Sequence, residues 1–135
     1  QLLATVTVVT PNVPEARLLC DLPDADPRQL ARAVRALGPD VAVVTGGHAE
    51  AASDHYCDGG EVIEIEGARH PDGAAHGSGC THSAVLAGRL AHRDSPLQAA
   101  RIARAIAGDA VRDGLRFLGA GAGPVDVLGL ARPSE

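Results

Sequence analysis

The sequence predicts an α/β fold built around a parallel β-sheet, and three observations support this fold class. Residues 5–10 (TVTVVT) and residues 41–44 (VAVV) are continuous apolar or β-branched runs, typical of strands that are buried on both faces. Between these runs, Leu30, Val34 and Leu37 recur at helical spacing. A strand, a helix and a second strand in this order predict a βαβ unit, in which the two strands are parallel.

Local capping signals place the first helices. Residues 10–12 (TPN) end the first strand, and a short helix is expected over residues 14–19. Residues 26–29 (DPRQ) combine an N-cap aspartate, a proline at the first helical position and a glutamine that completes a capping box. They therefore mark the start of the helix between the two strands, and Gly38-Pro39 marks its end.

A β-hairpin is expected after the second strand. Residues 55–57 and residues 61–66 flank the sequence Asp58-Gly59-Gly60, whose composition is typical of a tight turn. The hairpin should be followed by a loop over residues 67–76.

Two helices and a short strand are expected in the remainder of the chain. The first helix covers about residues 80–91. The second begins at the capping signature SPLQ of residues 95–98 and should continue to about Leu118, with Phe117 on its apolar face. Residues 124–128 (PVDVL) are expected to form a terminal strand.

Composition limits the classes of partner. The formal net charge of −5 argues against nonspecific binding to nucleic acid or to an anionic membrane, and no apolar run approaches the length of a transmembrane helix. All 12 basic residues are arginine, so no site can use a lysine. The three cysteines are widely spaced, which favours free thiols and a cytoplasmic location. Because the chain opens on Gln1 almost directly before a strand, we expect it to be a fragment of a longer domain.

The sequence His76-Gly77-Ser78-Gly79-Cys80-Thr81 carries the clearest chemical signal. Its glycines allow a sharp turn and a close approach to a ligand, and the helix that follows directs free N–H groups at the loop. This arrangement binds anions, phosphates above all. Cys80 would lie at the helix N-terminus, where the thiolate is favoured. The alternative is a glycine-rich turn followed by a small packed cysteine.

Two further motifs follow the predicted strands, at one edge of the sheet. Asn12 and Glu15 could organise phosphate and the waters of a magnesium ion, or they could simply form a helix capping box. Thr45, Gly46 and Gly47 could contact a polyphosphate through a hydroxyl and two flexible amides, or could form a plain turn.

The histidines and the last glycine-rich loop are weaker signals. The six histidines have no metal-ligand spacing, so scattered, solvent-facing side chains are expected rather than a metal site. The Gly119–Gly123 loop is either a flexible turn or a lid over a nucleotide or substrate.

Taken in order, these segments resemble one enzyme family. The sequences TPNVPEA (10–16), VTGGH (44–48), HGSGCTHSAVLAG (76–88) and GAGAGPVDVL (119–128) are similar to the C-terminal half of hydroxymethylpyrimidine/phosphomethylpyrimidine kinase, a ribokinase-like enzyme of thiamine biosynthesis. The resemblance implies that residues 1–135 form a single partial domain. That domain would be the nucleotide-binding half of a three-layer sandwich around a parallel sheet.

The resemblance also implies a reaction and its residues. ATP would phosphorylate hydroxymethylpyrimidine, a small-molecule substrate, and then its monophosphate. Cys80 matches the position of the catalytic base, and Gly77, Ser78, Gly79 and the Cys80 amide match the anion hole. Asn12 and Glu15 match the element that organises Mg²⁺ and phosphate. Thr45, Gly46 and Gly47 match the strand-end motif near the nucleotide.

The chain departs from the family pattern at two points. Thr45 stands where the family usually has a lysine, and the family's N-terminal half is missing. The departures leave open a noncatalytic nucleotide- or phosphate-binding remnant, or a half-kinase that depends on a partner. An open edge strand would invite pairing with the missing half or with another copy of the chain. The cysteine version of the glycine-rich motif is also found in hydroxyethylthiazole kinases.

Overall fold

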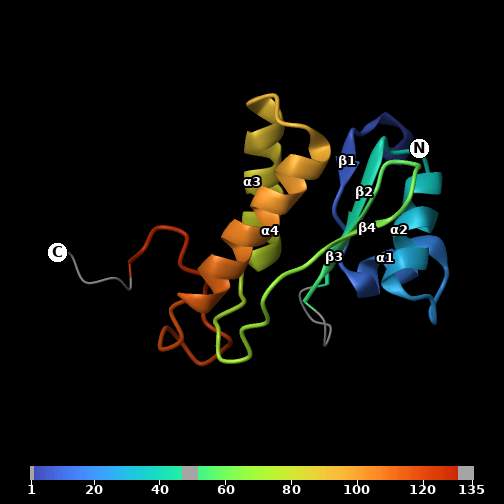
Figure 1. The fold of residues 1–135 in the computed structure, drawn as a ribbon. Helices are drawn as coiled ribbons and strands as arrows, with labels where there is room; N and C mark the ends of the chain where they lie inside the picture. Colours follow the sequence, from blue (N-terminus) through green and yellow to red (C-terminus); the bar gives the residue numbers. More distant parts are fainter. Residues whose placement is uncertain (1, 47–51, 131–135) are drawn as a thin grey trace. The chain divides into compact units, whose positions relative to one another are not determined.

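A computed structural model describes residues 2–46 and 52–130. The contacts divide the chain into two compact units, residues 1–67 and residues 68–135 (Figure 1). Each unit is described by itself below. No helix in the described part of the chain is both long enough and apolar enough to cross a bilayer.

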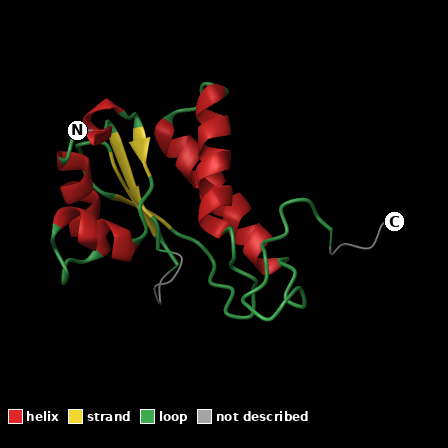
Figure 2. Cartoon of the chain, turned by 180° about the vertical axis from the view of Figure 1, so that it is seen from behind, coloured by secondary structure: helices red, strands yellow, loops and turns green. Residues whose placement is uncertain are grey.

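The first unit contains a mixed four-stranded sheet (Figure 2). Its strands follow chain order: β1 (Val8–Val9), β2 (Val41–Val44), β3 (Asp54–Cys57) and β4 (Ile63–Ile65). β1 and β2 are parallel, which confirms the predicted βαβ unit. β3 runs antiparallel to both β2 and β4, so the predicted hairpin is also confirmed, and parallel pairing is restricted to the first pair of strands.

Two helices, both preceded by capping boxes, complete this unit. α1 (Val13–Cys20) begins at Asn12, and α2 (Pro27–Ala36) begins at Asp26 with Pro27 in its first turn, as predicted. Both helices contribute to one apolar core with β2, β3 and the hairpin. The buried members of that core are Ala16, Leu30, Ala31, Val34, Ala42, Val44, Cys57 and Val62.

The prediction of a strand over residues 5–10, buried on both faces, is wrong in extent. Leu2–Thr5 form a short 3₁₀ helix (η1), and only Val8 and Val9 pair with β2. The Thr5 hydroxyl donates a hydrogen bond of 2.8 Å to the Leu2 carbonyl. Such local side-chain bonds offer the backbone an alternative to strand pairing. Both strand residues are half-buried, since β1 has one neighbour within the described residues.

The second unit consists of two helices and the loops at their ends. α3 (Ser78–Ala91) packs against α4 (Pro96–Arg112). The buried side of α4 is a stripe of alanines, which lets neighbouring backbone approach closely: Ala99, Ala100, Ala103, Ala107 and Ala110. Ser95 caps α4 by accepting a hydrogen bond from the Gln98 N–H, as its sequence predicted.

Two predictions for the C-terminal part are wrong. α4 ends at Arg112 rather than near Leu118, and Phe117 is fully exposed beyond it. Past the C-cap Asp113, the Leu115 N–H bonds to Pro124 O at 2.9 Å rather than to a helical carbonyl, and Gly114 packs so closely on Ala74 that an added Cβ would lie 2.6 Å from the Ala74 Cβ. Residues 124–128 form no strand: Pro124 makes an isolated parallel bridge to His76, and pairing does not continue because the Asp126 N–H bonds to Ala110 O instead (2.9 Å).

Candidate active site

The N-terminus of α3 differs from those of the other long helices. Its N-cap is Gly77, in the left-handed conformation with φ 90° and ψ 2°, and no side chain caps it. By contrast, Asn12, Asp26 and Ser95 cap α1, α2 and α4 with side-chain oxygens. The first N–H groups of α3 are therefore left without a side-chain partner, which is the condition under which a helix end binds an anion.

Hydrogen bonds around this turn identify the available donors. The Ser78 N–H donates to Ala75 O at 3.1 Å, and the Thr81 N–H donates to Gly77 O at 2.9 Å. The N–H groups of Gly79 and Cys80 have no acceptor among the residues that the structure describes. An added Cβ at Gly79 would meet nothing within 4 Å, so there is open space beside these two donors.

Cys80 occupies the first turn of α3 with an exposed side chain. The other two cysteines are less accessible. Cys57 is buried in the core of the first unit, and Cys20 is half-buried, where burial raises the pKa of its thiol. All three are free, as predicted. Within the described ranges, Cys80 therefore presents the one exposed thiol, and it lies beside two N–H groups that have no acceptor there.

The loop before α3 is held in place by the C-terminal segment. The His76 N–H donates to Gly123 O at 3.1 Å, and the Val125 N–H donates to His76 O at 3.0 Å. Gly123 has φ 70°, and a Cβ there would lie 2.5 Å from Leu115 O. One end of the predicted Gly119–Gly123 loop is thus fixed against the glycine-rich turn by contacts that require a glycine.

The predicted meeting of two motifs at one sheet edge is confirmed within the first unit. Asn12 and Thr45, at the carboxyl ends of β1 and β2, form an isolated parallel bridge, in which the Thr45 N–H donates to Pro11 O at 2.9 Å. Asn12 Oδ1 accepts from the Glu15 N–H at 2.8 Å, and Glu15 Oε2 accepts from the Asn12 N–H at 2.9 Å. The capping-box interpretation of these two residues is therefore correct. Glu15 Oε1 has no hydrogen bond within the described residues.

Asp54 is a residue of this edge that the sequence reasoning missed. Its side chain is fully buried, and its Oδ1 accepts a 3.1 Å hydrogen bond from the Gly46 N–H. The Gly46 amide is thus engaged and is not the flexible donor that was expected. Asp54 lies one residue before the strand predicted over residues 55–57, and the structure places it inside β3. Gly47, also predicted in this motif, lies outside the described residues.

The histidine prediction is wrong for two residues. His55 and His82 are buried, at 8% and 4% exposed. Burial is the main influence that lowers the pKa of His55, opposed by Glu64 and assisted by Arg28. No group of three or more metal-ligating side chains occurs among the described residues. The two histidines are thus part of the packing of their units.

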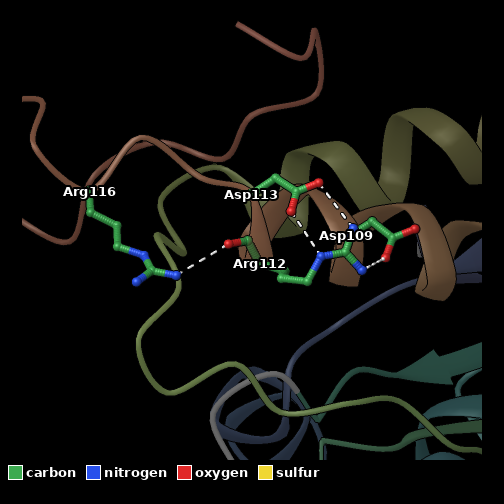
Figure 3. Close-up of polar contacts among 4 residues, drawn as sticks. All are labelled: Asp109, Arg112, Asp113 and Arg116. Atoms are coloured by element: carbon green, nitrogen blue, oxygen red, sulfur yellow. Dashed lines mark hydrogen bonds and ion pairs between the residues drawn. The ribbon is translucent and has the colours of Figure 1, made fainter. Parts of the chain in front are cut away.

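A shallow groove of about 240 Å³ lies along the C-terminal end of α4. Asp109, Asp113 and Asp126 line it together with apolar side chains. Arg112 binds both of the helix carboxylates, Asp109 through Nη1 at 2.5 Å and Asp113 through Nε at 2.8 Å (Figure 3). Arg116 donates to the Arg112 carbonyl at 3.4 Å. Arg112 thus pairs with two of the three carboxylates that line the groove.

The structure therefore gathers the candidate residues into two groups. Asn12, Glu15, Thr45 and Gly46 meet at the sheet edge of the first unit, and Gly77, Ser78, Gly79 and Cys80 form the first turn of α3 in the second.

Comparison with known proteins gives the family. Residues 1–126 match the model of the phosphomethylpyrimidine kinase family. A hydroxymethylpyrimidine/phosphomethylpyrimidine kinase of Streptomyces coelicolor is 38% identical over 130 residues, which are 93% of this chain and 48% of that protein. A protein of the same name from Mycobacterium tuberculosis is 40% identical over 99 residues, which are 68% of this chain and 36% of that protein. The chain thus spans about half the length, or less, of the curated relatives it matches.

Solved structures agree with this assignment. The ADP complex of Bacillus subtilis pyridoxal kinase superposes with a TM-score of 0.88 at 29% identity, covering 96% of this chain and 53% of that one. Staphylococcus aureus pyridoxal kinase in complex with AMP-PCP and pyridoxal superposes with a TM-score of 0.86 at 30% identity, covering 95% of this chain and 49% of that one. Thermotoga maritima ribokinase shares the fold: it superposes with a TM-score of 0.71 at 19% identity, covering 92% of this chain and 41% of that one. The predicted ribokinase-like fold is confirmed, and the chain belongs to the phosphomethylpyrimidine kinase family.

Proposed function

We propose that this chain carries the nucleotide and phosphoryl-transfer machinery of a kinase that uses ATP to phosphorylate hydroxymethylpyrimidine and then its monophosphate. The observation that carries the proposal is the first turn of α3, where exposed Cys80 lies beside two unpaired N–H groups. Family membership supplies the substrate class, a small-molecule pyrimidine, and the place in thiamine biosynthesis.

The first turn of α3 has two tasks in this reaction. The hydroxymethyl oxygen attacks the γ-phosphorus of ATP, the bond from that phosphorus to the β–γ bridging oxygen breaks, and ADP leaves. The hydroxyl proton passes to the Cys80 thiolate. Charge on the transferring phosphoryl group is stabilised by the N–H groups of Gly79 and Cys80 and by the helix end. The left-handed Gly77 and its neighbour Ser78 shape the turn.

The sheet edge of the first unit would hold Mg²⁺ and the phosphates. Magnesium usually keeps several waters and takes only one or two protein carboxylates, together with substrate phosphates. Glu15 fits this requirement, because one carboxylate oxygen serves the cap while Oε1 remains available. Asn12 would hold Glu15 in place through the capping box, while Thr45 offers its hydroxyl and Gly46 the shape of the turn.

One observation favours a second candidate, a noncatalytic nucleotide-binding module or a half-kinase that works with a partner. Thr45 provides no positive charge where the family resemblance would place a lysine. The partner would be a chain that supplies the N-terminal half found in the relatives, or a second copy of this chain. A cytoplasmic location, favoured by the three free cysteines, stays a prediction.

Calorimetry with ADP and Mg²⁺, followed by a turnover assay with ATP and hydroxymethylpyrimidine, tests these alternatives. Binding with phosphorylated product supports the kinase. Binding without product, unrestored by an added N-terminal half, supports the noncatalytic module. Absence of both binding and product overturns the proposed function.

The role of Cys80 has its own test within the turnover assay. Replacing Cys80 by alanine should lower turnover by about 10²-fold or more, because a general base is lost, while ADP affinity changes little. Cys20→Ala, which removes the half-buried thiol of α1, is the matched control and should keep turnover. Unchanged turnover in Cys80→Ala would show that this thiol is not the base.

A further inference from the structure

We propose that Asp54 is a positioning residue for nucleotide binding, acting through the turn that leaves β2. The inference rests on the proposed function, because it assigns Asp54 to the sheet edge where the phosphates and Mg²⁺ would bind. Asp54 itself touches no ligand in this account. Its carboxylate holds the backbone of Gly46, and thereby the place of Thr45 beside Asn12.

The strand register brings Asp54 to this turn. β2 and β3 are antiparallel with Val44 opposite His55, so the next pair along the register places Thr45 opposite Asp54. From there Asp54 Oδ1 reaches across to the Gly46 N–H at 3.1 Å, and the side chain is completely buried. The contact is therefore built by the sheet itself and does not depend on a surface side chain.

Two successive amides of the turn are held by different partners. The Thr45 N–H donates to Pro11 O, which ties the turn to the start of α1, and the Gly46 N–H donates to Asp54, which ties it to β3. With both bonds made, Thr45 is fixed next to Asn12, the N-cap of α1. Loss of the Asp54 bond would free the Gly46 N–H, while the bond from the Thr45 N–H to Pro11 O would remain.

The chemistry of the side chain supports a specific role. A buried carboxylate is costly unless its oxygens are paired, and an apolar side chain would stabilise a buried strand position at lower cost. The gain from aspartate at this position is thus the fixed geometry of residues 45–46.

The test compares three replacements of Asp54 in the full 135-residue chain by calorimetry with ADP and Mg²⁺. Asp54→Ala removes the acceptor and should weaken ADP binding at least 10-fold. Asp54→Asn retains an acceptor oxygen without the charge and should bind ADP within about 3-fold of the unmodified chain. Asp54→Ser, whose side chain is too short to reach Gly46, replaces the alanine variant if that variant does not fold. Glu64→Gln removes an exposed carboxylate on β4 and should leave ADP affinity unchanged.

Amide hydrogen exchange separates positioning from a general loss of structure. In Asp54→Ala the Gly46 amide should exchange at least 10-fold faster, while the Val43 amide in the middle of β2 keeps its protection. Three results would each overturn the inference. They are an ADP affinity of Asp54→Ala equal to that of the unmodified chain, weakened ADP binding by Asp54→Asn, and faster amide exchange throughout β2 in Asp54→Ala. If the unmodified chain itself does not bind ADP, the proposed function fails first and the inference falls with it. Normal binding by Asp54→Ala contradicts the inference alone.

Discussion

Gly77 and Gly79 lie two residues apart in the first turn of α3, and alanine at the two positions should have opposite effects on stability. Gly77 has φ 90°, a conformation that costs a residue with a Cβ about 1–2 kcal/mol. The nearest atom to an added Cβ, Val125 Cγ2, is at an ordinary contact distance of 3.5 Å, so the cost comes from the backbone rather than from a clash. Gly77→Ala should therefore destabilise the chain by about 1–2 kcal/mol.

Gly79 is a helical residue, and an added Cβ would meet nothing within 4 Å. Alanine is a better helix former than glycine, so Gly79→Ala should raise stability by up to about 1 kcal/mol. Because Cβ atoms tilt toward the helix N-terminus, the new methyl group would project toward the proposed anion site. ADP binding should weaken even as the fold becomes more stable.

Urea unfolding followed by circular dichroism measures the first effect, and calorimetry with ADP measures the second. Gly88→Ala is the matched control, because Gly88 lies in the middle of the same helix with open space around its Cβ position. It should stabilise the chain by about 1 kcal/mol and leave ADP affinity unchanged. A Gly77→Ala variant as stable as the unmodified chain, or a Gly79→Ala variant that binds ADP equally well, would refute this reasoning.

Three further predictions concern single side chains. Tyr56 is the one tyrosine, and burial together with Asp58 raises its pKa to about 12, so absorbance at 295 nm should show a midpoint near pH 12 in the folded chain. In the unfolded chain the pKa of this tyrosine should be near its ordinary value of about 10, so stability should fall as the pH rises from about 10 to about 12. A titration midpoint near pH 10 in the folded protein would contradict the buried environment of Tyr56. Burial lowers the pKa of His55, so below the ordinary histidine pKa of about 6.5 the unfolded state binds more protons than the folded state, and stability should fall as the pH drops. The fall of the urea unfolding midpoint with pH should therefore be less steep in His55→Gln than in the unmodified chain, and unchanged in His92→Gln, which replaces an exposed histidine. Equal pH dependence in the two variants would contradict the buried environment of His55. Thr45→Lys restores a positive charge beside the phosphates and should tighten ADP binding about 3- to 10-fold in low salt, with a smaller gain in high salt; unchanged affinity in calorimetry would separate Thr45 from the phosphate site.

Features set by neighbouring residues could be predicted from the sequence. Asn12 with Glu15 and Asp26 with Gln29 form the expected capping boxes, because an N-cap involves residues only three apart. The turn at Asp58-Gly59-Gly60 is likewise local. The uncapped start of α3 followed from its two glycines, and the role proposed for Cys80 came from the family resemblance.

Features set by distant contacts could not be predicted. Just past the end of α4, the Leu115 N–H bonds to Pro124 O and Gly114 approaches Ala74, forty residues away along the chain. His82 is buried although nothing near it in sequence indicates this. Asp54 reaches Gly46 only because the antiparallel register of β2 and β3 places them together. Each of these depends on a pairing or packing partner that a single sequence does not reveal.

The central claim is that the free N–H groups at the start of α3 bind phosphate. Proton–nitrogen correlation spectra of the chain, recorded during titration with ADP and Mg²⁺, test it most directly. We expect saturable shifts of the Gly79 and Cys80 amide signals, larger than those of the Ser78 amide, whose N–H is already bonded to Ala75 O. Unmoved Gly79 and Cys80 signals at a concentration of ADP that saturates binding elsewhere in the chain would contradict the claim.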